Sequence, residues 1–137
     1  MNILDEQILE NQRQLLRSWR IPVRQIGHDI GRKGLKDKEI IPLLLQSRKS
    51  SFFTLDFDFF ESRLCHAKYA IVCMDVGKHE AAVYIRRLLR HPDFDTAAKR
   101  MGKVIRLSSM RIGVRRLHAE DEVFIDWCDS LFGNPGK

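Results

Sequence analysis

The feature that most restricts the fold of this chain is the unbroken apolar run YAIVCM at residues 69–74. A strand of this composition is buried on both faces, and such strands occur mainly in parallel sheets with helices on either side. Strand and helix patterns alternate over the first 91 residues, which predicts an α/β domain with a mainly parallel central sheet flanked by helices. The predicted strands are residues 2–4, 23–26, 51–55 and 69–74.

Apolar residues at helical spacing predict helices between these strands and after the last one. The predicted helices are residues 8–19, 38–46 and 79–91. Pro42 should kink or shorten the second helix, because proline lacks a backbone donor. The pattern changes after Pro92: residues 104–117 predict strands with a hairpin at Ser108-Ser109, and residues 120–129 predict a C-terminal helix. We therefore expect one domain over residues 1–137, with a core of about 1–92 and an extension of about 93–137.

Composition narrows the class of protein. The chain has 137 residues, of which 44% are hydrophobic, and this is enough for one compact core. No apolar run approaches the roughly 20 residues of a membrane span, and the N-terminus does not have the pattern of a secretory signal. We expect a cytoplasmic protein with no membrane contact. The three cysteines lack CxxC spacing, so we interpret them as small buried apolar residues.

Four aspartates fall where the predicted strands end or a helix begins: Asp5, Asp37, Asp56 and Asp58. The carboxyl ends of parallel strands share one edge, where open α/β sheets bind their ligands. Clustered carboxylates repel one another, and a hard divalent cation such as Mg²⁺ or Mn²⁺ relieves that repulsion. Taken singly, Asp37 is also explained as a helix N-cap and Asp5 as a solvated strand end.

Three motifs in this order resemble the small PIN-like domains found among prokaryotic toxin–antitoxin genes. They are LDE at residues 4–6, DKEI at 37–40 and TLDFDF at 54–59. The resemblance covers about the first 90 residues. It implies a three-layer PIN-like fold and a Mg²⁺- or Mn²⁺-dependent ribonuclease with Asp5, Asp37, Asp56 and Asp58 as metal ligands. It also implies a protein inhibitor, an antitoxin, as partner. Auxiliary candidates in the same motifs are Glu6, Glu39 and Thr54.

The chain departs from the family pattern at several positions. Leu55 and Phe57 stand where basic residues are common between the acids, Trp19-Arg20 stands where a glycine turn is usual, and Pro42 lies inside the second helix. These departures favour an alternative in which the chain is a non-catalytic PIN-like module that binds nucleic acid or a protein.

Basic residues gather in two segments, and the net charge is +6. The first group lies beside Asp37 and can hold a phosphate backbone: Arg32, Lys33, Lys36 and Lys38. The second lies in residues 86–116 and includes Arg86, Arg87 and Arg90. The alternative for the second group is a solvated face neutralised by the acidic stretch 120–129.

The sequence therefore predicts a metal-dependent endoribonuclease acting on RNA, with the binding module as the competing function. A phosphorylation-dependent receiver fits less well, because no Ser or Thr ends the strand at Met74-Asp75. A homodimer is a further possibility. Phe124, Trp127 and Phe132 can pack within one chain or across two copies, and periodicity does not separate these cases.

Overall fold

In the computed structural model, residues 1–127 are described and form a seven-stranded sheet in the order β2-β1-β3-β4-β5-β6-β7. The strands are β1 (Asn2–Leu4), β2 (Arg24–Gln25), β3 (Ser50–Thr54), β4 (Tyr69–Met74), β5 (Lys103–Leu107), β6 (Ile112–Arg116) and β7 (Val123–Ile125). The first five strands are parallel, whereas β6 and β7 are antiparallel to their neighbours. The α/β class and the mainly parallel sheet are confirmed.

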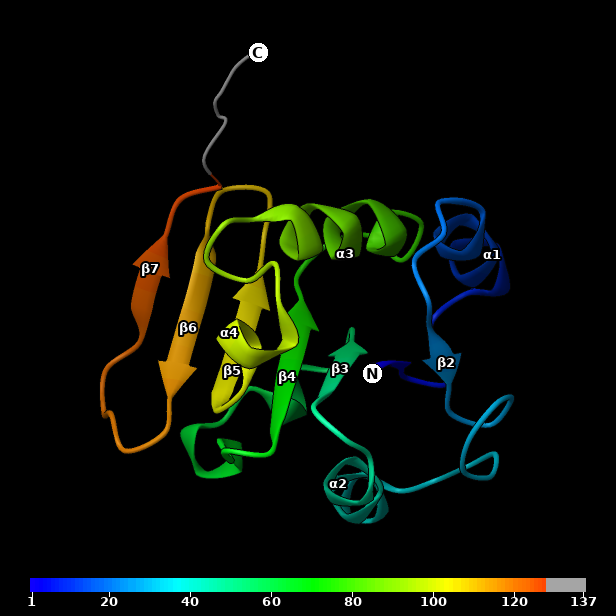
Figure 1. Cartoon of the computed structure of the whole chain (residues 1–137), viewed down its shortest axis with the longest axis horizontal. Helices are drawn as coiled ribbons and strands as arrows, with labels where there is room; N and C mark the ends of the chain where they lie inside the picture. The colour runs from blue at the N-terminus through cyan, green and yellow to red at the C-terminus, as the bar shows by residue number, and fades with distance from the viewer. Residues whose placement is uncertain (128–137) are drawn as a thin grey trace.

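Helices cover the two faces of this sheet and give the domain three layers (Figure 1). They are α1 (Glu10–Ser18), α2 (Asp37–Gln46), α3 (Ala81–Arg90) and α4 (Ala97–Arg100), with 3-10 turns η1 (Phe57–Phe59) and η2 (Ser62–Leu64). α1 and α3 lie on one face, and α2 lies on the other. No helix within residues 1–127 is long and apolar enough to cross a membrane.

The alternation of side chains along the strands divides the core into two clusters. In β3, Phe53 belongs to the cluster that contains Leu16 of α1 and Leu88 of α3, while its neighbour Phe52 belongs to the cluster of Leu44 in α2. All six residues of β4 are buried, as expected for a strand covered on both faces. The core therefore fixes which ends of the strands meet at each edge of the sheet.

The predicted C-terminal helix is wrong where the structure describes it. Residues 123–125 form the edge strand β7, which pairs with β6 through Val114↔Val123 and Ile112↔Ile125. Val123, Phe124 and Ile125 fit a strand as well as a helix, and pairing with β6 decides between them. The hairpin at Ser108-Ser109 is confirmed as the β5–β6 turn. Cys128 and Phe132 lie outside the described residues.

The remaining predictions agree with the structure in part. The strand over 23–26 shortens to β2, and Cys65 and Cys73 are buried as expected. α2 includes Pro42 and continues to Gln46, so the expected shortening does not occur. The short helix α4 has no counterpart among the sequence predictions. The sheet continues without a break across the boundary expected near residue 92.

Candidate functional site

Three of the four predicted aspartates come together at the carboxyl edge of the sheet. Asp56 and Asp58 follow β3, and Asp37 is the first residue of α2. One carboxylate oxygen from each of these three residues lies within 4.8 Å of the others. The predicted N-cap role of Asp37 is wrong, because Lys36 occupies the N-cap and Asp37 is the residue after it. We call Asp37, Asp56 and Asp58 the acidic triad.

Thr54 connects the fourth aspartate, Asp5, to the acidic triad. Its buried hydroxyl donates to Asp5 Oδ2 over 2.6 Å and accepts from the backbone N–H of Asp56 over 3.0 Å. The backbone N–H of Asp58 then donates to Asp56 Oδ1 over 2.9 Å. A chain of hydrogen bonds thus joins the ends of β1 and β3, between which the strand order reverses. Ligands in doubly wound sheets bind at this kind of position.

Burial and mutual repulsion shift two of these carboxyl groups. Burial raises the pKa of Asp5 above its ordinary value, and the charges of Asp56 and Asp37 raise it further, against the hydrogen bond from Thr54 that lowers it. Burial also raises the pKa of Asp37, and the charges of Asp56 and Asp58 add to this shift. Both shifts mean that the ionised cluster is unfavourable without a compensating cation.

The acidic triad fits a divalent ion. Hard cations such as Mg²⁺ and Mn²⁺ take carboxylate oxygens, and an ion with ligand bonds of about 2.0–2.6 Å bridges oxygens up to about 4–5 Å apart. Asp37 and Asp58 are exposed and Asp56 is partly exposed, so water can complete the coordination. None of the ion pairs within residues 1–127 includes a triad carboxylate.

The two auxiliary glutamates have structural partners instead. Glu6 accepts a hydrogen bond from the backbone N–H of Gly34 over 2.8 Å, which ties the glycine-rich loop 27–36 to the end of β1. Glu39 accepts from Arg32 over 2.7 Å and from the backbone N–H of Lys36 over 3.0 Å, which stabilises the first turn of α2. Both carboxylates are therefore engaged outside the acidic triad.

The basic residues of the 27–38 segment differ in whether they have an acidic partner. Arg32 is paired with Glu39, whereas Lys33 is an exposed residue of the same loop. Lys38 lines a groove of about 450 Å³ that reaches the acidic triad. The groove has an apolar floor and a charged rim formed by Asp37, Lys38, Asp58, Glu61 and Arg63. Its size and its mixture of apolar and charged groups suit part of a nucleotide.

The second predicted basic group lies on another layer. α3 packs on the face of the sheet opposite to α2. The guanidinium of Arg86 stacks on Trp19 at 3.6 Å, and that of Arg87 lies 4.2 Å from the ring of Trp127. Arg90 is exposed. The structure thus separates these arginines from the acidic triad, and two of them pack on aromatic rings.

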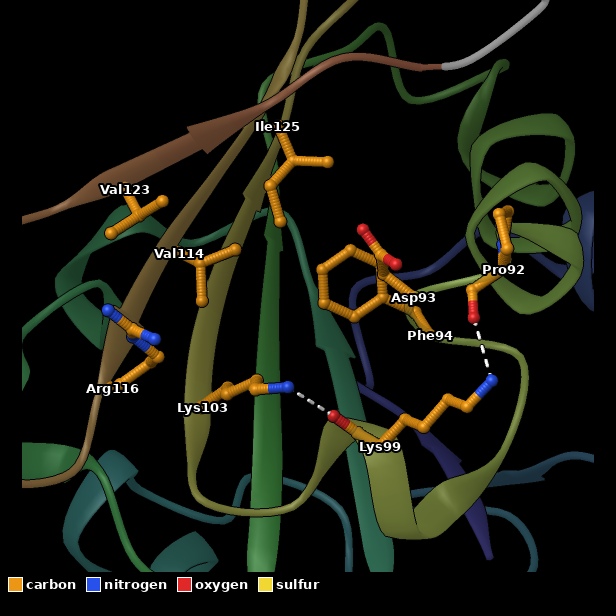
Figure 2. Close-up of a pocket in the computed structure, with 9 residues that line it drawn as sticks. All are labelled: Pro92, Asp93, Phe94, Lys99, Lys103, Val114, Arg116, Val123 and Ile125. Atoms are coloured by element: carbon orange, nitrogen blue, oxygen red, sulfur yellow. Dashed lines mark hydrogen bonds between the residues drawn. The ribbon is translucent and has the colours of Figure 1, made fainter.

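A second cavity, of about 390 Å³, lies beside Lys103 at the start of β5 (Figure 2). Its apolar wall comes from Phe94, Val114 and Ile125, and cations from Lys99, Lys103 and Arg116 surround it. Burial and the nearby Arg116 lower the pKa of Lys103. Among residues 1–127, Asp93 is the sole carboxylate that lines it, so the described wall of this cavity lacks the clustered acids of the triad.

We compared the chain with protein-family models, with curated proteins and with solved structures. None of these three comparisons gave a match. The resemblance to PIN-like domains therefore rests on the three motifs, and the function proposed below depends on the geometry of the acids.

One residue that positions the site was not singled out from the sequence. The buried side chain of Gln25 donates through Nε2 to the carbonyls of Asp5 and Ile8, at 3.1 and 2.7 Å. These bonds fix the backbone that follows β1 and carries Asp5. The sequence pattern did not indicate this role, because a glutamine in a short strand is usually interpreted as a residue that faces solvent.

Proposed function

We propose that this chain is a metal-dependent endoribonuclease of PIN-like type, which hydrolyses RNA phosphodiesters with Mg²⁺ or Mn²⁺. The observation that supports this proposal is the acidic triad, whose oxygens lie within 4.8 Å of one another at the carboxyl edge of a mainly parallel sheet. Like charges at this distance oppose folding, and a divalent ion removes that cost. The nearby basic residues support a nucleic acid as substrate, and RNA in particular comes from the resemblance to PIN-like domains alone.

In this proposal, the residues of the site have three roles: holding the ion, orienting Asp5 and attracting the phosphate backbone. Asp37, Asp56 and Asp58 hold the ion, and Asp5 adds negative charge beside them while Thr54 fixes its orientation. A bound Mg²⁺ or Mn²⁺ supplies Lewis-acid activation of a water and of the scissile phosphate. Lys38, on the rim of the groove, attracts the phosphate backbone. Catalysis of this type needs no covalent nucleophile from the protein.

A cellular role as the toxin of a toxin–antitoxin pair follows from the same resemblance. In that role an antitoxin protein would cover the acidic edge and prevent RNA from reaching it. The cytoplasm is the compartment where such a pair and its RNA substrate meet.

The alternative is a non-catalytic PIN-like module that binds nucleic acid or a protein. One observation favours it: Asp5 is buried and one of its oxygens is already occupied by the Thr54 hydroxyl. A site with one carboxylate closed in this way can bind an ion without the full ligand set. Metal binding and cleavage therefore have to be measured separately.

Calorimetric titration of Mn²⁺ into the purified protein tests the proposal, with RNA cleavage measured on the same samples. The parent should bind Mn²⁺ with defined stoichiometry and cleave RNA. Asp56→Asn/Asp58→Asn should lose both activities and keep its fold, because Asn can still accept the hydrogen bond at position 56. Asp121→Asn is the matched control, since Asp121 is an exposed acid outside the triad.

The outcomes separate the two functions. Binding and cleavage that disappear together in the double variant support the nuclease. Binding without cleavage in the parent favours the non-catalytic module. Equal binding by the parent and the double variant would place the ion elsewhere and refute the site.

A further inference from the structure

The outer half of the sheet presents arginine and phenylalanine side chains on the face away from α3. In β5, Ile105 and Leu107 pack in the same core as α3, so the intervening Arg106 points to the opposite face. The same alternation places Arg115 of β6 on that face, since Val114 belongs to the α3 side. We call the following six residues the Arg/Phe strip: Phe57, Phe60, Arg106, Arg111, Arg115 and Phe124.

Contacts link the members of the Arg/Phe strip from η1 to the edge strand. The guanidinium carbons of Arg106 and Arg115 lie 5.1 and 5.0 Å from the ring centre of Phe60. Arg106 is also 6.0 Å from the ring of Phe124, and Arg111 stacks on that ring at 3.8 Å. The rings of Phe57 and Phe60 are 6.3 Å apart. The strip is thus continuous across β5, β6 and β7.

A glycine at the centre of the strip leaves room for a neighbouring side chain. Gly113 pairs with Arg106 on one side and Phe124 on the other, so the middle residue of this row across three strands has no side chain of its own. A Cβ at this position would overlap with Glu122 Oε2. Glu122 instead crosses over Gly113 and pairs with Arg106 at 2.9 Å. Two of the three arginines of the strip, Arg111 and Arg115, form none of the ion pairs found within residues 1–127.

The strip exposes apolar and aromatic surface next to the acids. Phe57 is 38% exposed and Phe124 is 44% exposed, which is unusual for rings of this size. Phe57 lies between Asp56 and Asp58 in the chain, so the strip begins inside the segment that carries two residues of the acidic triad. A polymer whose backbone reaches the triad can therefore extend onto the strip.

We propose that the Arg/Phe strip is a stacking platform for unpaired bases of RNA, placed outside the acidic groove. Exposed rings accept stacked bases of any sequence, and arginines bind phosphates and stack on bases as well. Bases inside a duplex are stacked on one another and cannot lie on these rings, so the strip selects single-stranded segments. This inference rests on the proposed nuclease function for its biological role, and it adds a second contact surface for the nucleic acid outside the acidic groove.

Fluorescence anisotropy with a labelled, unstructured oligouridine in EDTA tests the platform without metal or cleavage. Phe124→Leu keeps an apolar side chain but removes the ring, and we expect it to weaken binding about 5- to 100-fold. Arg111→Ala should weaken binding and reduce the slope of log K against log salt by about 0.7. Lys103→Ala and Arg116→Ala remove cations that line the separate cavity and should leave affinity close to that of the parent.

The same titrations contain the results that would overturn the proposal. Equal affinity of the parent and both strip variants, or tighter binding to duplex RNA than to oligouridine, removes the platform. A failure to bind oligouridine together with Arg111-dependent binding of polyglutamate assigns the strip to an acidic protein partner. Failure of the nuclease is seen separately: oligouridine binding that depends on the strip, with no cleavage in Mn²⁺, leaves the platform standing without the enzyme.

Discussion

The charged side chains of the acidic triad repel one another, whereas those of the Arg/Phe strip have stabilising partners. At the triad, like charges face one another while nearby arginines pair elsewhere, Arg32 with Glu39 and Arg63 with Glu61. On the strip, each arginine lies beside a ring, and Arg106 also has Glu122. The triad therefore opposes folding until a cation binds, whereas the strip contributes to folding on its own. Substitutions at the triad should therefore reduce metal binding, whereas substitutions on the strip should reduce RNA binding and also lower stability.

A modest effect on stability is expected at Gly113. Gly113→Ala places a Cβ against the carboxylate of Glu122, and this flexible side chain must then leave Arg106, so the loss of that ion pair should cost about 0.2–1 kcal/mol. Urea unfolding measures the loss. Mn²⁺ binding by the folded variant should equal that of the parent, because the triad lies on other elements.

A second substitution checks this cause. If the clash with Glu122 is responsible, Gly113→Ala combined with Glu122→Ala should be more stable than the sum of the two single effects indicates. Additive losses would contradict the steric explanation.

Thr54→Val tests the hydrogen bonds that connect Asp5 to the acidic triad. Valine has nearly the shape of threonine but leaves the Asp5 carboxylate without its hydroxyl donor and the Asp56 N–H without its acceptor. We expect a loss of about 1–2 kcal/mol, together with weaker Mn²⁺ binding. Thr54→Ser keeps the hydroxyl and should retain the metal affinity, and equal loss in both variants would contradict the role of this bond.

Arg86 tests whether stacking on a ring stabilises the fold. Arg86→Gln loses the contact with Trp19, and we expect a cost of about 0.5–1 kcal/mol in thermal or urea unfolding. Arg90→Gln changes an exposed arginine on the same helix and is the control. A loss in oligouridine affinity for Arg86→Gln would extend the RNA-binding surface to α3.

The smallest effect is a dependence of stability on pH. Because the pKa values of Asp5 and Asp37 are raised in the folded state, their contribution to stability is greatest below the unfolded value of 3.8 and is lost as pH rises through the folded values. Asp37→Asn should reduce this loss by about 0.2–0.5 kcal/mol, since its carboxyl is exposed. Urea midpoints between pH 3 and 7 measure it, and saturating Mn²⁺ should oppose the loss.

The sequence was sufficient where one pattern had one interpretation. The apolar run of β4 and the helical spacing of α3 both fixed their elements, and the order of acids located three of them at one edge. The sequence prediction was incomplete or wrong where the role of a residue depends on a partner far away in the chain. Glu39 resembles a ligand until Arg32 is seen beside it, and β7 resembles a helix until β6 is placed.

The Arg/Phe strip was out of reach for the same reason. Its members are separated by up to 67 positions between Phe57 and Phe124, and no short motif joins them. They meet because β5, β6 and β7 pair in a particular register, with Gly113 between Arg106 and Phe124. Register depends on pairing across the sheet and is not visible in local spacing.

The hydrogen bond between Thr54 and Asp5 joins residues 49 positions apart, and this separation affects how the protein folds. Parallel strands cannot begin as a hairpin, so the pairing of β1 with β3 must close a long loop, and such closures slow folding. The ends of both strands must be in place before Asp5 lies beside Asp56. The full metal affinity, to which the charge of Asp5 contributes, should therefore appear late in refolding, and the rate at which it appears would report the docking of β1 against β3.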